Sequence, residues 1–174
     1  AINDPQLMQE IAVATAREVA ATGIDWTFAP TLAQAKDYRW GRTYESYSDD
    51  PDLVEAYGRA MVEGIEGEGL AATAKHFIGD GGTTAGRDQG NTELSTADLL
   101  GQHGSGYTGA FDAAVDTVMA TFNSVNGVKV HGSKSLLTDV LREQLGFDGM
   151  VISDWNGVGQ VQGCSDTSLS LIHI

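Results

Sequence analysis

The amino-acid sequence predicts an α/β protein with a parallel sheet, and three observations support this class. Helix-like and strand-like patterns alternate along the 174 residues, with connections that suit crossovers between parallel strands. Residues 150–152 form a short unbroken apolar run, which is typical of a strand buried on both faces. The predicted strands end in polar residues, namely Lys75 and His76, Asn123, and Asp154. A TIM-like (β/α)8 barrel builds its site from strand ends in this way, so we expect an incomplete (β/α)8 barrel, with an open doubly wound sheet as the alternative.

The first part of the chain predicts a helix, a strand and a long loop. The Asp-Pro pair at residues 4–5 is a helix start, and apolar residues at helical spacing continue until Gly23. Residues 24–28 alternate between apolar and polar side chains and stop at Pro30, which predicts a strand. Residues 30–49 have neither period and are rich in aromatic, Arg and acidic side chains. A loop of this length inside a compact domain is usually functional.

A second helix, strand and loop follow. Residues 50–51 repeat the Asp-Pro helix start, and an amphipathic apolar stripe runs to Ile65 before a Gly-rich segment. Residues 70–77 are the second predicted strand, which is built of small residues. Residues 78–92 are Gly-rich like a phosphate-binding loop. They lack the Gly-Lys-Ser/Thr ending and the helix start of a P-loop, so we reject that interpretation.

The remaining residues predict two further helix and strand pairs. A capping box at residues 95–98 begins a helical segment that a Gly-rich stretch interrupts near residues 104–106. Residues 118–122 are the third predicted strand. A serine-capped helix with one apolar stripe, closed by a glycine, is predicted over residues 133–146 and leads into the strand at residues 150–152.

Composition narrows the partners that we expect. The hydrophobic share of 41% argues against disorder, and the formal net charge is −14. Nucleic acid and anionic membranes bind through clustered Lys and Arg, so we expect neither as a partner, and a neutral or cationic ligand fits better. The single cysteine, Cys164, has no Cys or His companions at zinc spacing, and we expect no metal site. The sequence contains neither an apolar run long enough to span a bilayer nor a signal-peptide pattern.

Asp154 and Trp155 are the strongest candidates for chemistry. Asp154 follows the strand at residues 150–152, and reactive groups in alternating strand and helix proteins lie at the carboxyl ends of strands. Aromatic faces pack against the apolar side of a sugar ring, while charged groups bind its hydroxyls. This pair, with Lys, His and Arg nearby in the fold, therefore suits carbohydrate chemistry. Glycoside hydrolysis needs two carboxyl groups, and only one is evident here.

The sequence alone is also compatible with purely structural roles for the polar residues at the strand ends and for Arg42. Asp154 could cap the helix or turn that follows it. Residues 75–76 could form an ion-paired group at a strand end, and Arg42 could be the structural partner of Glu45.

Four blocks of the sequence together resemble glycoside hydrolase family 3. They are residues 37–51, 74–83, 118–127 and 146–155. The blocks have the order and spacing of that family, and the resemblance runs from about Asn3 to Asp166. It points to bacterial exo-acting β-glucosidases and glucan glucohydrolases. The resemblance implies a retaining hydrolase that releases glucose from the non-reducing end of β-glucosides or β-glucans, and we expect no cofactor.

The resemblance also implies a role for individual residues. Asp154 matches the catalytic nucleophile of the family. The groups that hold the hydroxyls of the sugar in the outermost subsite match Arg42, Lys75 and His76. Residues that line this subsite match Met119 and Trp155.

Departures from the family pattern carry further expectations. Phe122 stands where some relatives have a Tyr, so a hydrogen bond from that side chain to Asp154 is unavailable. Residues 79–89 contain no His where the hexosaminidase branch has its acid/base loop, which argues against that activity. In the glucosidase branch the acid/base is a Glu on a second domain beyond the barrel. We expect the missing second domain of the same chain to supply it, so this chain alone is expected to be inactive.

The resemblance also sets the expected domain and location. We expect residues 1–167 to be part of the N-terminal barrel domain of the family and residues 168–174 to be a non-native tail. The family implies a periplasmic or secreted protein. A β-xylosidase of the same family and a non-catalytic sugar-binding homologue are the alternative functions.

Overall fold

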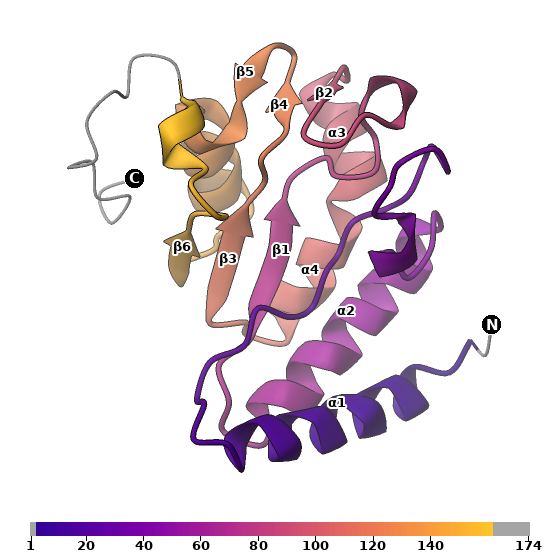
Figure 1. Ribbon diagram of the computed structural model, residues 1–174, viewed down its shortest axis with the longest axis vertical. Helices are drawn as coiled ribbons and strands as arrows, with labels where there is room; N and C mark the ends of the chain where they lie inside the picture. Colours follow the sequence, from indigo (N-terminus) through magenta and orange to yellow (C-terminus); the bar gives the residue numbers. More distant parts are fainter. Residues whose placement is uncertain (1–2, 162–174) are drawn as a thin grey trace.

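The computed structural model describes residues 3–161, and a parallel three-stranded sheet runs through it (Figure 1). Its strands, in order across the sheet, are β1 (Thr73–Phe77), β3 (Thr117–Ala120) and β6 (Met150–Ile152). All three lie within or next to the ranges that the sequence predicts. The first two are shorter than predicted.

A fourth extended segment, residues 25–32, lies beside β1. Isolated parallel bridges join Trp26 to Ala71 and Thr31 to Lys75. The prediction of a strand over residues 24–28 is met only by this irregular pairing. Pro30 lies within the segment and has no N–H to donate to the ladder, which is a physical reason for the interruption.

The order of the strands distinguishes the barrel from the doubly wound alternative. Residues 25–32, β1, β3 and β6 lie side by side in chain order, and every pairing is parallel. A doubly wound sheet reverses the strand order at a switch point, and the part of the chain described here has no such reversal. The sheet also does not close on itself within residues 3–161. The fold is therefore an incomplete (β/α)8-type barrel, as predicted.

Two helices begin at the predicted Asp-Pro pairs. Helix α1 (Pro5–Ala20) follows Asp4, whose side chain accepts a hydrogen bond from the N–H of Leu7. Helix α2 (Pro51–Glu66) starts after Asp50 in the same way, with the N–H of Asp52 as the donor. These caps satisfy amide groups that have no partner inside the helix.

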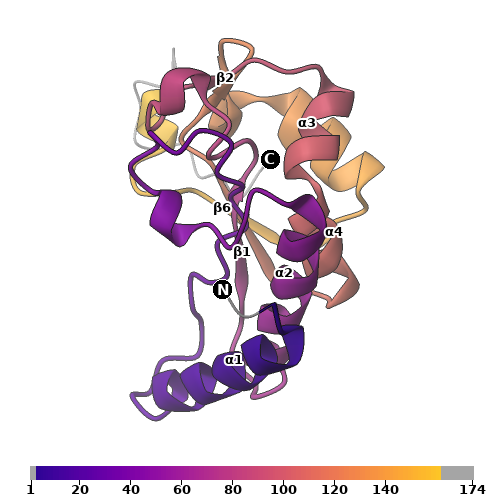
Figure 2. The same ribbon diagram turned by 90° about the vertical axis from the view of Figure 1, so that its right-hand side faces the viewer.

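Helix α2 packs between α1 and α4 (Ser105–Asp112), and α2 and α4 lie along one side of the sheet (Figures 1 and 2). Gly64 explains how closely α1 and α2 approach, because a Cβ at this position would lie only 2.5 Å from the Cβ of Ala12. Phe77 of β1 and Tyr107 of α4 are both buried, and their rings meet edge to face with centroids 5.0 Å apart. Such side chains fill the core between the sheet and its helices.

The interrupted helical segment is confirmed as two helices. Helix α3 (Thr96–His103) is capped by Ser95, and Gly104 separates it from α4. A further helix over Ser135–Gln144 has the wider π-type turn, and it ends where the N–H of Leu145 donates to the carbonyl of Val140. Its apolar stripe packs into the core, as the sequence predicts.

A second, smaller sheet lies beyond the upper ends of β1 and β3 in Figure 1. It consists of β2 (Asn91–Thr92), β4 (Ser124–Val125) and β5 (Val128–Lys129), with β4 and β5 joined as an antiparallel hairpin. Asn126 and Gly127 form the hairpin turn and both have positive φ, which Asn-Gly turns tolerate well. This hairpin was not predicted from the sequence.

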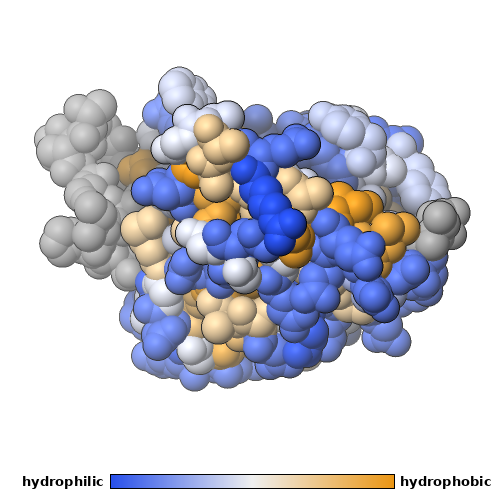
Figure 3. Space-filling view, turned by 90° about the horizontal axis from the view of Figure 1, so that it is seen from below, coloured by the Kyte–Doolittle hydropathy of each residue, from blue (hydrophilic) through white to orange (hydrophobic). Residues whose placement is uncertain are grey.

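The surface viewed from below in Figure 3 mixes polar and apolar residues. Among the apolar residues of α1, Leu7 and Ile11 are exposed. No helix within residues 3–161 combines the length and the apolar character needed to cross a membrane. Cys164 and the predicted tail at residues 168–174 lie outside the described residues.

Candidate active site

A small hollow at the carboxyl edge of the central sheet brings three of the predicted site residues together. Arg42 comes from the long loop, His76 from β1, and Asp154 from the segment after β6. The full lining consists of Arg42, His76, Asp80, Asp88, Gln89, Thr121, Phe122, Asn123 and Asp154. Parallel strands place their carboxyl ends at one edge, which explains why residues far apart in the sequence meet here.

His76 is fixed by a buried hydrogen-bond chain. Its Nδ1 lies 2.6 Å from Oδ2 of Asp80, and both side chains are only 4% exposed. The hydroxyl of Thr121 donates to the other oxygen of Asp80 and accepts the N–H of Asn123 at 3.1 Å. The chain therefore links the end of β1 to the end of β3. It holds the imidazole of His76 in one orientation.

Arg42 is held by Glu45 and reaches His76. Two hydrogen bonds of 2.7 and 2.8 Å join its guanidinium to the Glu45 carboxylate, so the ion pair considered from the sequence is present. These hydrogen bonds raise the pKa of Arg42 and lower that of Glu45. Nη2 of Arg42 also lies 3.4 Å from Nε2 of His76. Because a guanidinium can only donate, Nε2 of His76 is the acceptor in this contact, and Nδ1 is the nitrogen that faces Asp80.

Asp154 is held through its backbone and one carboxylate oxygen. The N–H of Trp155 donates to Oδ1 at 2.6 Å, and the N–H of Gly157 donates to the Asp154 carbonyl at 3.0 Å. The N–H of Asp154 itself donates to Nε2 of His131 at 3.2 Å. Its Oδ2 faces the hollow and lies 3.5 Å from Nε2 of His76. One oxygen is thus fixed while the other points toward the remaining site residues.

Lys75 and Met119 occupy one level of the sheet. They are register partners, and Met119 also pairs with Ile152 of β6, two residues before Asp154. The register shifts just after Lys75, and irregularities of this kind often re-aim side chains near active sites. Met119 is buried.

The ammonium of Lys75 has no hydrogen-bond or ion-pair partner within the described part of the chain. Burial lowers its pKa, which the carboxylates of Glu45, Asp154 and Asp80 oppose. Lys75 is therefore a half-buried cation near three carboxylates, with all of its N–H groups available to a ligand.

Trp155 and Phe122 differ in their placement. The indole of Trp155 is 88% exposed and does not line the hollow, although its backbone holds Asp154. Phe122 lines the hollow, with its ring 6.1 Å from that of His131.

Three residues that support the site, Asp80, Thr121 and His131, are not among the site residues that the sequence predicts. Asp80 stands four residues after His76, in the Gly-rich loop. Thr121 directly follows β3, whose polar end was noted only at Asn123. The sequence feature that points to His131 is the Asn126-Gly127 pair, which is typical of a tight hairpin turn. This turn brings the chain, and with it His131, back to the strand ends.

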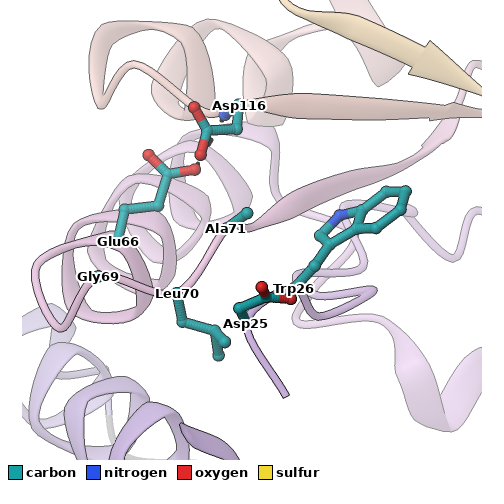
Figure 4. Close-up of a pocket in the computed structure, with 7 residues that line it drawn as sticks. All are labelled: Asp25, Trp26, Glu66, Gly69, Leu70, Ala71 and Asp116. Carbon is teal, nitrogen blue, oxygen red and sulfur yellow. Dashed lines mark hydrogen bonds between the residues drawn. The ribbon is translucent and has the colours of Figure 1, made fainter. Parts of the chain in front are cut away.

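A different hollow lies at the opposite, amino edge of the sheet (Figure 4). Its lining includes Trp26 and the carboxylates of Asp25, Glu66 and Asp116. Glu66 has a structural role there, because one of its oxygens accepts the N–H groups of Ala72 and Asp116. Reactive groups in this class of fold lie at the carboxyl edge, so this hollow is not the candidate site.

No group of three or more His, Cys, Asp or Glu side chains within residues 3–161 is arranged to hold a metal ion.

Comparison with known proteins gives consistent matches. Residues 1–169 match the family model described as the glycosyl hydrolase family 3 N terminal domain. The crystal structure of the exo-1,3/1,4-β-glucanase ExoP from a Pseudoalteromonas species superposes with a TM-score of 0.92 at 56% identity, over 93% of this chain and 21% of that chain.

Two curated relatives are similar over most of this chain. A β-xylosidase from Formosa agariphila is 38% identical over 91% of this chain and 23% of its own length. A periplasmic β-glucosidase from Salmonella typhimurium is 31% identical over 84% of this chain and 20% of its own length. The chain therefore spans about a fifth to a quarter of the proteins that it matches.

Proposed function

This chain belongs to glycosyl hydrolase family 3, and we propose from that premise that the protein of which it forms part is an exo-acting β-glucosidase. It would release glucose from the non-reducing end of β-glucosides or β-glucans, with net retention at the anomeric carbon. One observation carries the proposal. Asp154 lies at the carboxyl edge with Oδ1 held by the Trp155 amide and Oδ2 facing His76 and Arg42 across a small hollow.

In the proposed mechanism, Oδ2 of Asp154 attacks the anomeric carbon and the aglycone oxygen leaves. A covalent glycosyl intermediate forms while the general acid protonates the leaving oxygen. Water then attacks the anomeric carbon from the face that the aglycone left, opposite Asp154, and breaks the bond to the Asp154 carboxylate. The amide of Trp155 fixes Oδ1 and so limits rotation of the carboxylate. Preorganisation of this kind lowers the barrier, because the nucleophile needs little rearrangement to reach the anomeric carbon.

We propose that Lys75, His76 and Arg42 hold the hydroxyls of the sugar ring in the outermost subsite. Lys75 fits this role because its ammonium has no partner among the described residues. Arg42 and His76 fit it because Glu45 and Asp80 hold them in fixed orientations. The exposed indole of Trp155 would supply apolar contact area to the sugar. Met119 is buried and does not line the hollow, so we propose that it contributes to the subsite as the register partner of Lys75.

The general acid of this mechanism is proposed to come from a second domain rather than from the carboxyl groups near Asp154. A general acid must be protonated near the working pH, whereas the hydrogen bonds from Arg42 lower the pKa of Glu45. Both oxygens of Asp80 are occupied by His76 and Thr121. We accordingly propose that residues 1–167 contribute the barrel part of the site and that a Glu elsewhere in the protein completes it.

Two alternative functions are a β-xylosidase and a non-catalytic sugar-binding protein. The similarity to a β-xylosidase supports xylosides as substrates, and these differ from glucosides in lacking the C6 hydroxymethyl group. A ratio of kcat/KM values on matched aryl β-glucosides and β-xylosides would separate the two. A non-catalytic sugar-binding protein would bind both without turnover.

We also propose a periplasmic or secreted location for the intact protein, since a relative at 31% identity is named as periplasmic.

The function is tested by measuring the anomeric configuration of the product that forms first. The intact protein would be incubated with an aryl β-glucoside, and the anomeric signals would be followed by NMR before mutarotation. The proposal predicts β-glucose first. Formation of α-glucose first, or no turnover of any β-glycoside, would refute it.

A further inference from the structure

The imidazole of His131 contacts the backbone of Asp154, the proposed nucleophile. His131 belongs to a short helical turn, Val130–Gly132, that follows the β4–β5 hairpin, and it is only 2% exposed. Its Nε2 accepts the N–H of Asp154 at 3.2 Å. A backbone amide can only donate, so Nε2 must be the unprotonated nitrogen and Nδ1 must carry the hydrogen.

The space for this imidazole depends on a glycine. A Cβ at Gly157 would lie 2.2 Å from Nε2 of His131, so only a residue without a side chain allows the contact. Phe122 packs on another side, with ring centroids 6.1 Å apart. The imidazole is thus enclosed by the segments that follow β3 and β6. On the side of Asp154, its polar contact is the hydrogen bond that Nε2 accepts from the backbone N–H.

The segment that carries His131 is itself anchored to the site. Lys129 Nζ donates to the carbonyl of Phe122 at 2.7 Å and to Oε1 of Gln160 at 3.1 Å. The first contact ties the hairpin to the end of β3, and the second ties it to the turn Val158–Gln160 after Asp154. A shift of the hairpin would therefore move the support of Asp154.

We infer that His131 is a positioning residue for the glycosidase reaction, which in its neutral form fixes the backbone of Asp154 and so aims the attacking oxygen. The inference rests on the proposed function, in which Asp154 is the nucleophile. His131 touches neither the hollow nor Oδ2, so it acts through Asp154.

Protonation would remove this support. A protonated imidazole has N–H groups on both nitrogens and cannot accept from Asp154. Burial lowers the pKa of His131, and the charge of Lys129, together with that of His76 when His76 is protonated, acts in the same direction. The carboxylate of Asp154 and the backbone of Thr121 favour the protonated form and oppose this shift. The net direction keeps His131 neutral at neutral pH, and acid converts it to the form that cannot support Asp154.

The test compares two variants of the intact enzyme on an activated aryl β-glucoside. His131→Gln can place Oε1 near the position of Nε2, which keeps an acceptor that does not titrate. His131→Leu has no acceptor. We expect His131→Leu to lower kcat about tenfold with little change in KM, the loss equivalent to one hydrogen bond. We expect His131→Gln to retain kcat within a few-fold at neutral pH and to move the acidic limb of kcat to lower pH.

His103→Gln is the matched control, because His103 is an equally buried histidine without contact to Asp154. Its acidic limb should coincide with that of the wild type. The inference is overturned if His131→Leu keeps the wild-type kcat, or if His131→Gln is as impaired as His131→Leu. Should His131→Leu fail to fold, the acidic limb of His131→Gln decides alone, and an unchanged limb overturns the inference. Labelling of a carboxylate other than Asp154 in the wild type would instead refute the proposed function, so the two failures are distinguishable.

Discussion

Nδ1 of His76 and Oδ2 of Asp80 lie 2.6 Å apart in the interior, four residues apart in the sequence and joined across the end of β1. The hydroxyl of Thr121 donates to the second oxygen of Asp80, so the carboxylate bridges two strand ends. Asp80 thereby fixes the ring that faces Asp154 and Arg42.

Replacing Asp80 by Asn should lower kcat/KM about 10- to 100-fold in the intact enzyme. A hydrogen bond to a buried charged group contributes about 1.5–3 kcal/mol, and the amide cannot accept from both partners at once. The measurement is kcat/KM on an aryl β-glucoside. Asp139→Asn, which removes an exposed carboxylate paired with Lys134, is the control and should have no effect. Equal values for both variants would contradict the role of Asp80.

Replacing Lys75 by Met should lower kcat/KM by a similar factor while leaving the product configuration unchanged. Since the Lys75 ammonium has no partner within residues 3–161, the loss would reflect contacts with the substrate rather than a broken ion pair. Lys134→Met is the surface control, because this ammonium is exposed. Full efficiency of Lys75→Met on a β-glucoside would remove Lys75 from the site.

Much of the fold follows from local patterns in the sequence. The Asp-Pro starts of α1 and α2, the break at Gly104 and the apolar run of β6 are short-range signals, and the structure contains each of them. The segment at residues 25–32 is different. Its alternation is real, but the regularity of its pairing depends on Pro30, whose effect on the ladder is not part of the apolar pattern.

The candidate site was only partly predictable, because its supporting contacts join distant segments. Thr121 and Asp80 are 41 residues apart, and His131 and Asp154 are 23 residues apart. No single sequence pattern contains such pairs. The exposure of Trp155 was likewise not predictable, since an indole beside a strand end is equally compatible with a buried ring.

Acid should destabilise the protein through His103. Burial lowers the pKa of this residue to about 4, from an ordinary value of 6.5. The unfolded chain therefore binds a proton at higher pH than the folded chain does. Stability from this source is complete above pH 6.5 and falls as the pH drops toward 4, by about 3 kcal/mol in total.

The measurement for His103 is thermal unfolding of the intact protein and of His103→Leu at about pH 7.5 and about pH 4.5, on either side of the ordinary histidine pKa. Both ring nitrogens of His103 lack hydrogen-bond partners within the described residues, so Leu removes polar atoms without breaking a bond. The melting temperature of the wild type should fall more between the two pH values than that of the variant. Equal falls would contradict the prediction, because they would show that folding does not lower the pKa of His103.

The 174-residue chain expressed alone should not hydrolyse an alkyl β-glucoside at an enzymatic rate. Glu45 is kept ionised by Arg42, and general acid catalysis typically contributes about 10²- to 10⁴-fold. An activated aryl glycoside needs less acid assistance and should react with the chain more readily. Rapid hydrolysis of the alkyl substrate by a monodisperse sample would mean that the acid lies within this chain, and Glu45 or Asp80 would then be reconsidered.

The most direct measurement of the central claim is trapping of the nucleophile in the intact enzyme. A 2-fluorinated glucoside with an activated leaving group slows hydrolysis of the covalent intermediate, which can then be located by peptide mapping. We expect a single label on Asp154, together with a product of retained configuration from the natural substrate. A label on any other carboxylate, or a product of inverted configuration, would contradict the assignment of Asp154 as the nucleophile.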